Sequence, residues 1–359
     1  MNTRYRLPLW VLLGIALLLL VLHLALPYLV RNYLNDKMAD MGDYRGHVDD
    51  VDLAWWRGAY SLSTLVIEKK AEAVQAPLFS AASIEIGVSW RTLWREHALV
   101  GAVILHQPHL NFVDDEDADD VQTGAGVDWR ERAKALVPFT LNEVRVVNGQ
   151  LSFRNFDAEP PVHVYANAID ASLYNLTNSA EQPQGRVARF EGKARFFDQA
   201  LIEASARFDP FTNWEDFEVS LRMTGLELTK LNDFSNAYGH FDFAGGTGDL
   251  VVEAQARDSQ LEGYIKPLLH DVDVFDLDQD LKNEDKGLFR GLWEALVGGG
   301  ENVLKNQRKD QFATRVALSG STRNAEVSPF QAFMAILRNG FVEAFSTRFE
   351  RSLDGEDKP

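Results

Sequence analysis

Two short segments contain residue types that could bind a metal ion or a phosphate group. His106 and His109 could ligate zinc, because imidazole nitrogen is a common zinc ligand. Residues three apart on a β-strand point to opposite faces, however, so this spacing disfavours a shared metal ion. Residues 245–248 imitate a phosphate-binding loop, but no lysine follows and the flanking pattern is that of strands. We therefore interpret the histidines as strand residues and the glycines as a bulge or turn.

Acidic side chains gather in two further segments. Residues 276–280 imitate the start of a calcium loop, but Leu281 stands where that loop needs glycine and Gly287 where it needs glutamate. Residues 114–126 have the composition of an exposed acidic loop, where weak divalent-cation binding stays open. The chain has no Gly-x-Ser-x-Gly elbow, and no carboxylate pair stands out by spacing. The sequence therefore predicts a protein that is not an enzyme, with no catalytic residue, metal or cofactor. An envelope hydrolase is the least favoured alternative.

Composition narrows the class of protein further. The chain has 359 residues, with 53 acidic and 36 basic side chains and a formal net charge of −17. It has no cysteine, which excludes a disulfide-stapled scaffold and any thiolate site. Nucleic-acid binding needs a basic face, so this acidic chain predicts no nucleic-acid partner. Anionic headgroups would repel it as well, so any contact with lipid must come through apolar surface or an anchor.

The most pronounced pattern is the apolar run of residues 7–30. As a helix this run is about 36 Å long, enough to cross a hydrocarbon layer of about 30 Å. Trp10 and Tyr28 lie near its ends, as interfacial aromatic residues do. A cleaved signal peptide is the alternative, but its apolar core is shorter and ends in a small-residue cleavage site that is missing here. The run therefore predicts an uncleaved single-pass membrane anchor.

Basic residues indicate the orientation of this anchor. Arg4 and Arg6 precede the run without an acidic residue, whereas acidic residues offset the basic ones after it. The positive-inside rule then places the N-terminus in the cytoplasm. The predicted organisation is a cytoplasmic tail (1–6), a transmembrane anchor (7–30), one extracytoplasmic domain (31–353) and a flexible tail (354–359).

Apolar and polar residues alternate along most of the chain beyond residue 45. In residues 201–208, for example, Ile202 and Ala204 alternate with Glu203 and Ser205. This alternation predicts strands with one apolar and one polar face. It recurs at residues 62–67, 84–88, 103–113, 144–153, 162–173, 188–196, 216–223, 250–256 and 312–318. Turn signals such as Asn148-Gly149 separate the runs, which predicts a long antiparallel meander of about fifteen strands.

Helical patterns are few. Residues 128–137 predict a short helix, and residues 288–297 form an amphipathic stripe before three glycines. Ser328 can cap a final amphipathic helix. The apolar face of that helix comprises Phe330, Phe333, Met334, Leu337, Phe341, Phe345 and Phe349. This helix could dock on the sheet, plug its end or meet a partner.

These few helices cannot cover the apolar face of so many strands. A one-sided sheet must cover that face, so the sheet must curl, close on itself or hold an apolar ligand. The predicted fold is mainly β: a transmembrane helix, then a long curved antiparallel sheet with a taco-like hydrophobic groove and amphipathic C-terminal helices. The candidate groove residues, chosen by alternation alone, are Ile202, Ala204, Phe208, Phe217, Val219, Leu221, Met223, Leu250 and Val252.

The order of these patterns resembles that of AsmA-like proteins. Residues 48–67 (VDDVDLAWWRGAYSLSTLVI) are similar to the opening of that family: a strand, a Trp-Arg-Gly turn and a strand after an anchor. Residues 84–93 with 103–112 resemble its next strand pair, and residues 144–153 (VRVVNGQLSF) resemble its Asn-Gly hairpin. Residues 263–275 and 309–320 and the Phe-rich final helix resemble an uncharacterised domain branch of this superfamily in Gram-negative bacteria.

The resemblance implies a location and a role. AsmA-like proteins are anchored in the bacterial inner membrane, project into the periplasm and are linked to phospholipid transport and cell-envelope integrity. Their sheets are similar to those of bridge-type lipid carriers. We therefore expect a periplasmic domain that binds lipid or another apolar ligand in its groove. The alternative is an envelope assembly scaffold that binds a protein partner by strand addition at a sheet edge.

Overall fold

The computed structural model describes residues 6–54, 58–70, 74–88, 99–115, 121–124, 139–177, 188–209, 216–239, 242–275, 311–313 and 316–321. Over these residues the protein is mainly β: one long N-terminal helix leads into a single 14-stranded sheet. This confirms the predicted fold class. The expected helices at residues 128–137 and 288–297 and the C-terminal helix lie outside the described residues.

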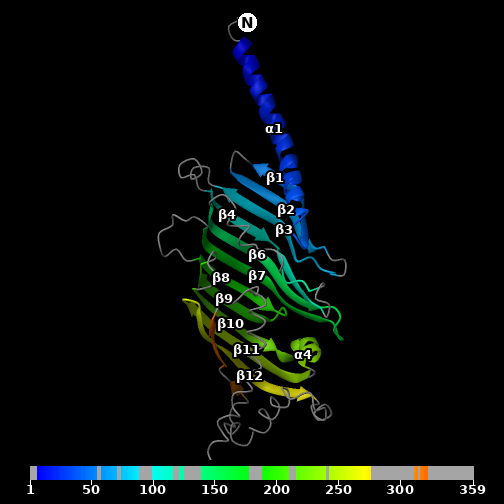
Figure 1. The fold of residues 1–359 in the computed structure, drawn as a ribbon, viewed down its shortest axis with the longest axis vertical. Helices are drawn as coiled ribbons and strands as arrows, with labels where there is room; N and C mark the ends of the chain where they lie inside the picture. The colour runs from blue at the N-terminus through cyan, green and yellow to red at the C-terminus, as the bar shows by residue number, and fades with distance from the viewer. Residues whose placement is uncertain are drawn as a thin grey trace, which may run out of the picture.

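Figure 1 shows the elements in order along the molecule, from α1 at the top to β12 at the bottom. The helices are α1 (Arg6–Met38), the 3₁₀-helix η3 (Leu228–Leu231) and α4 (Asn232–Gly239). The strands are β1 (Tyr44–Ala54), β2 (Ala59–Lys69), β3 (Phe79–Val88), β4 (Leu99–His106), β5 (His109–Asp114), β6 (Phe139–Asn155), β7 (Val162–Thr177), β8 (Ala188–Phe196), β9 (Ala200–Phe208), β10 (Phe217–Glu227), β11 (Asp242–Arg257), β12 (Gln260–Phe275), β13 (Gln311–Ala313) and β14 (Val316–Ser321).

Helix α1 contains the predicted anchor and continues beyond it to Met38. Its segment Trp10–Met38 is the one helix in the described part of the chain that is long and apolar enough to cross a membrane. None of its most apolar window is buried against the protein. A helix whose apolar side chains all face outward is typical of a membrane span. The structure therefore supports a single-pass anchor whose last turns project beyond the apolar run.

The strands pair mostly with their neighbours in sequence, in antiparallel order. The predicted meander is wrong at one place, because β6 runs parallel to both β4 and β5. A parallel neighbour requires the chain to cross back before it re-enters the sheet. The predicted strand at residues 103–113 is also divided, since Gln107 has a φ of 49° and Pro108 follows it between β4 and β5. His106 and His109 therefore lie on different strands.

A line of backbone irregularities crosses β2 to β7, and we call it the crease. Thr64, Gln107, Asn148 and Ala168 all have φ between 47° and 53°. The amide of Gln107 donates to the carbonyl of Val147 at 2.8 Å, and the β6–β7 register shifts on both sides of Gly149. Each extra residue in a strand bends it and increases its twist. The crease therefore contributes to the curvature of the sheet.

Two glycine pairs that looked like turns are bulges inside strands. Asn148-Gly149 is not a hairpin turn, because β6 continues through it and resumes pairing with β7 after one extra residue. A Cβ on Gly149 would lie 2.8 Å from Val146 Cγ1, so a larger residue there would force Val146 to shift. Gly245-Gly246 lies within β11 between two register shifts, with φ of 108° at Gly246. This second pair confirms the predicted bulge.

Candidate functional site

Cross-strand pairing aligns apolar residues into unbroken rows on one side of the sheet, which we call the apolar face. The central row comprises Val51, Leu62, Ile84, Leu105, Val146, Ala171, Gly192, Ala204, Leu221, Val252, Ile265 and Val316. A second row beside it comprises Leu53, Tyr60, Ile86, Val103, Val144, Leu173, Phe190, Ala206, Val219, Ala254, Gly263 and Leu318. Both rows run from β1 to β12 and on to β14.

The crease keeps this face continuous. Beyond it lies a third apolar row: Gly46, Ile67, Phe79, Leu110, Leu151, Ala166, Phe196 and Ala200. On β6 the residues of the third and central rows, Leu151 and Val146, are an odd number of positions apart. On β8, which has no bulge, the corresponding residues Phe196 and Gly192 are an even number of positions apart. One extra residue reverses which face each side chain points to. The sequence shifts its alternation by one at the crease, so the same face stays apolar on both sides.

The nine predicted groove residues lie together on β9, β10 and β11. Met223 pairs with Ile202 on one side and Leu250 on the other, and Leu221 pairs with Ala204 and Val252 in the same way. Phe217 pairs with Phe208. All nine side chains are half-buried: neighbouring strands pack against them, yet each keeps some exposed surface. The structure thus places them on one surface that the described protein does not seal.

The opposite face of the same strands is polar. Leu201, Glu203, Ser205 and Arg207 of β9 are all exposed, alternating with the half-buried apolar residues. Lys193 Nζ lies 3.1 Å from Glu203 Oε1 in an ion pair, with both side chains largely in solvent. An exposed pair of this kind contributes little stability. This face therefore keeps the sheet soluble without forming a second core.

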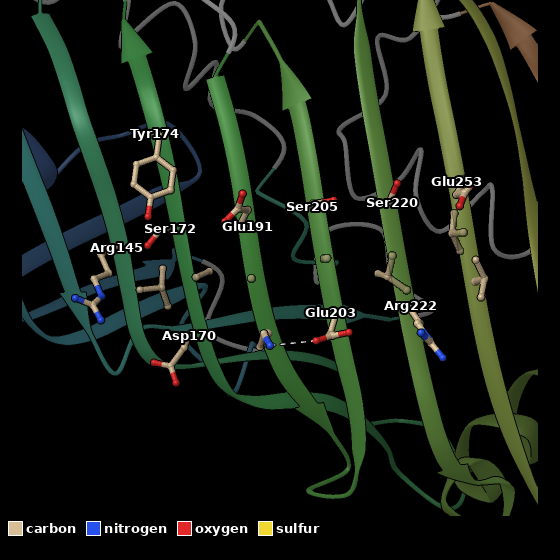
Figure 2. Close-up of a pocket in the computed structure, with 18 residues that line it drawn as sticks. Arg145, Asp170, Ser172, Tyr174, Glu191, Glu203, Ser205, Ser220, Arg222 and Glu253 are labelled. Carbon is tan, nitrogen blue, oxygen red and sulfur yellow. Dashed lines mark ion pairs between the residues drawn. The ribbon is translucent and has the colours of Figure 1, made fainter.

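A shallow hollow of about 860 Å³ crosses β6 to β11 and is shown in Figure 2. Of the nine predicted residues, Ala204, Leu221 and Val252 line it, whereas the other six are not part of its lining. Its remaining lining comprises Arg145, Val146, Asp170, Ala171, Ser172, Tyr174, Glu191, Gly192, Lys193, Glu203, Ser205, Ser220, Arg222, Val251 and Glu253. Most of these side chains, such as Glu203 and Ser205, belong to the polar face, so the hollow lies on that face and not over the apolar one. Sequence reasoning missed these polar residues as members of a hollow. These residues are the polar members of the same alternating pattern, and from the sequence they were interpreted only as solvent-exposed.

Helices η3 and α4 cover one margin of the apolar face, and the sequence did not predict them. Leu228 of η3 is buried, and its Cδ2 lies 3.0 Å from the position of a Cβ on Gly248. The rings of Phe234 and Tyr238 in α4 pack against Phe153 of β6, with centroids 6.3 and 6.1 Å away. The cover is therefore made of aromatic and aliphatic side chains laid on an apolar strand surface.

Polar contacts hold α4 at both of its ends. The side chain of Asn232 donates to the carbonyl of Phe243 at 3.0 Å and accepts from the amide of Phe243 at 2.9 Å. The hydroxyl of Tyr238 donates to Asp114 at 2.6 Å and accepts from Asn155 Nδ2 at 3.0 Å. Burial, and then the bond to the Asp114 carboxylate, raise the pKa of Tyr238 far above its ordinary value. The phenol therefore stays neutral and donating at physiological pH.

Several predicted features fall outside the described residues. These are the C-terminal helix with Phe330, Phe333, Met334, Leu337, Phe341, Phe345 and Phe349, the segment 276–280, Trp56 and Arg57 of the Trp-Arg-Gly turn, and most of the acidic loop. In the parts of the chain that are described, no three His, Asp or Glu side chains cluster in a way that could hold a metal ion. His106 lies 3.2 Å from Glu85 Oε1, and His109 is exposed on β5.

Comparison with known proteins gives no relative: no family model matches the chain, and no curated protein matches it. The AsmA-like resemblance therefore remains a prediction from the sequence patterns alone. The fold and the site define a class by themselves. It is a protein with one apolar N-terminal helix joined to a single long sheet, one face of which is apolar along its whole length.

Proposed function

We propose that this chain is an inner-membrane-anchored periplasmic protein whose apolar face binds the acyl chains of phospholipid, and that it helps to move lipid in the cell envelope without catalysing a reaction. The observation that carries the proposal is the pair of apolar rows that cross the sheet while the side chains on β9 to β11 remain half-exposed. Large exposed apolar patches on a protein typically mark a surface that binds another apolar molecule.

The energetics favour a ligand with a long flexible chain. Burial of apolar surface is worth roughly 25 cal/mol per Å², so an acyl chain laid along the rows gains several kcal/mol without any polar contact. The half-buried side chains of Val219, Leu221 and Val252 supply apolar surface for such a chain. Binding of this kind discriminates weakly between chains. We therefore expect affinity for acyl chains as a class.

The orientation belongs to the same proposal. The arginines at positions 4 and 6 favour a cytoplasmic N-terminus by the positive-inside rule. The resemblance to AsmA-like proteins favours the bacterial inner membrane and the periplasm. The membrane is then the source or the destination of the lipid, and the sheet extends away from it.

The rival scaffold function needs a sheet edge that is free to accept a strand. At β1 this edge is occupied, because the side chain of Asn35 already bonds both the amide and the carbonyl of Val48. Strand addition is therefore disfavoured at this edge. A partner would have to bind elsewhere on the sheet.

Native mass spectrometry of the full-length protein, released from detergent, tests the proposal. We expect phospholipid to co-purify and a fluorescent fatty acid to bind. Ile202→Glu places a charge on the apolar face and should weaken fatty-acid binding at least about tenfold, because an unpaired carboxylate resists contact with an acyl chain. Leu201→Glu is the matched control, since Leu201 is the neighbouring aliphatic residue on the opposite face and is 43% exposed. Equal binding by both variants, or no lipid in the unsubstituted protein, would contradict the proposal.

A further inference from the structure

The last turns of α1 are attached directly to the first strand of the sheet. Asn35 Nδ2 donates to the carbonyl of Val48 at 3.1 Å, and the amide of Val48 donates to Asn35 Oδ1 at 2.8 Å. One side-chain amide thus satisfies both backbone groups of a residue on the outer edge of β1, as a neighbouring strand would. Met38 packs against the buried cluster of Met41, Tyr44 and Leu78. The anchor helix and the sheet therefore form one unit, with no flexible linker between them.

A second contact fixes the direction of β1 relative to α1. Arg31 Nη1 donates to the carbonyl of Asp49 at 3.4 Å. Arg31 precedes Asn35 in the helix, whereas Asp49 follows Val48 in the strand. The strand therefore runs back along α1 toward the apolar run of residues 7–30. In Figure 1, β1 is accordingly the uppermost strand and lies beside the lower half of α1.

Chain geometry shows how far β1 reaches. From Asn35 back to Val30, where the apolar run ends, the helix covers about 7.5 Å at ~1.5 Å per residue. From Val48 to Ala54, the end of β1, the strand covers about 20 Å at ~3.3 Å per residue. Even a strand inclined by about 60° to the helix axis rises about 10 Å along it. The end of β1 thus reaches the level at which α1 leaves the hydrocarbon layer.

We infer that the β1–β2 end of the sheet, with the pairs Leu53–Tyr60 and Ala54–Ala59, rests on the surface of the bilayer that α1 spans. These pairs begin the second apolar row and border the central one, so the apolar face opens onto the outer leaflet of that membrane. In the sequence, the residues that join the two strands are Trp55, Trp56, Arg57 and Gly58. A consequence is that acyl chains enter the apolar face from the leaflet at β1 and β2. This consequence rests on the proposed function.

Surface charge does not hold this end at the membrane. Asp49, Asp50 and Asp52 of β1 are all exposed, and carboxylates are repelled by anionic headgroups. The contact must therefore be maintained mechanically, by the bonds between α1 and β1. Asn35 is then a positioning residue, and its loss should separate the sheet end from the bilayer while the sheet itself stays folded.

Depth-dependent quenching in nanodiscs of phosphatidylethanolamine and phosphatidylglycerol tests the inference with the full chain. The protein has no cysteine, so a fluorophore can be attached at one introduced site. Ala59→Cys labels the β1–β2 end, and Glu218→Cys labels an exposed position on β10, roughly 35 Å further along the sheet at ~4.8 Å per strand. A lipid with a nitroxide headgroup should quench the label at position 59 several-fold more than the label at position 218. Equally weak quenching at both positions would overturn the inference.

Substitution of Asn35 provides the second arm. In the Ala59→Cys background, Asn35→Ala should reduce quenching at least about twofold while the circular dichroism spectrum stays unchanged. Asn35→Asp, which keeps the acceptor for the Val48 amide, replaces it if the alanine variant does not fold. Unchanged quenching in a folded variant would refute the positioning role of Asn35. Quenching at position 59 requires only contact with the leaflet, whereas the Ile202→Glu assay requires acyl-chain binding, so the two proposals fail separately.

Discussion

The two ends of the sheet use the same alternating pattern for different purposes. Beside residues 74–78 and 121–124, at the side of the crease away from the central row, several apolar side chains of the first region (β1 to β5) are sealed: Val48 and Leu78 are 2% and 5% exposed. Around β9 to β11 the side chains of the apolar face, such as Leu221 and Val219, are only half-buried. The strands themselves do not differ. What differs is the cover, because non-strand segments fold over the first region and the described chain leaves the second one partly open.

The cover over the first region is made by short segments with their own polar anchors. Gln122 is fully buried, and its Nε2 donates to the carbonyls of Asn111 and Ala76 at 3.0 and 3.2 Å. The amide of Asn111 donates to the carbonyl of Leu78 at 2.8 Å. Buried hydrogen bonds of this kind hold loops in a single arrangement. The comparison therefore indicates that β1 to β5 supply much of the stability, which leaves the face of β9 to β11 available for a ligand.

The largest expected effect comes from a pair of leucine truncations, one in each region. Leu78→Ala should lower the free energy of unfolding by about 2–4 kcal/mol, because it leaves a cavity in the cluster with Met41 and Tyr44. Leu221→Ala should cost less, at most about 1.5 kcal/mol, since part of that side chain already meets solvent. Denaturant unfolding followed by circular dichroism measures both. Equal losses would remove the distinction between a sealed and an open region.

A smaller effect is expected at α4, which covers the margin between the two regions. Tyr238→Phe removes the bonds to Asp114 and Asn155 and should destabilise the docking of α4 by about 1–2 kcal/mol. Hydrogen exchange should then accelerate in α4 and remain unchanged in β1 to β3. If exchange accelerated equally throughout the chain, α4 would be part of the global fold and not a local cover.

The same tyrosine predicts a dependence on alkaline pH. Its pKa is raised in the folded protein by burial and by the Asp114 carboxylate, so folding favours the neutral phenol. The stability this provides is fully present below pH 10, the ordinary pKa, and is lost progressively as the pH rises above it. Absorbance titration at alkaline pH should show one fewer late-ionising tyrosine in Tyr238→Phe than in the unsubstituted protein, because Tyr238 has the most strongly raised pKa among the described tyrosines. Identical titrations of the two proteins would contradict this environment for Tyr238.

The smallest effect is expected on the polar face of the open region. Lys193→Ala removes the ion pair with Glu203 but should change the free energy of unfolding by less than about 1 kcal/mol, because both side chains are largely exposed. The difference should vanish in high salt, which screens exposed pairs. A loss as large as that of Leu78→Ala would show that this face is a structural core.

Sequence patterns were sufficient for the strands of the open region. On β9 the alternation of Ile202 and Ala204 with Glu203 and Ser205 predicted both the strand and its two faces. One face of such a strand is exposed to solvent, so apolar and polar residues alternate along its sequence and the strand can be predicted from that period. Alternation selected the nine residues, and the antiparallel register of the consecutive strands β9, β10 and β11 places them together.

Other features depend on contacts that one sequence does not reveal. The sequence does not show that β6 pairs in parallel with β4, because the alternation of apolar and polar residues is the same whichever strand is the partner. Asn148-Gly149 has the composition of a hairpin turn but is a bulge within β6, and Pro108, distant in sequence, packs beside Gly149. Helix α4 has eight residues, too few for a clear helical period, and is held by Asn232 and Tyr238 through contacts distant in sequence.

The central claim is that the apolar face of β9 to β11 carries acyl chains, and crosslinking in living cells tests it most directly. A photoreactive amino acid is placed at Val219 on the apolar face or, in a separate strain, at its exposed neighbour Glu218 on the polar face. Irradiation followed by mass spectrometry of the full-length protein should give phospholipid adducts at position 219 and none at position 218. Protein adducts without lipid at position 219, or equal lipid adducts at both positions, would contradict the account.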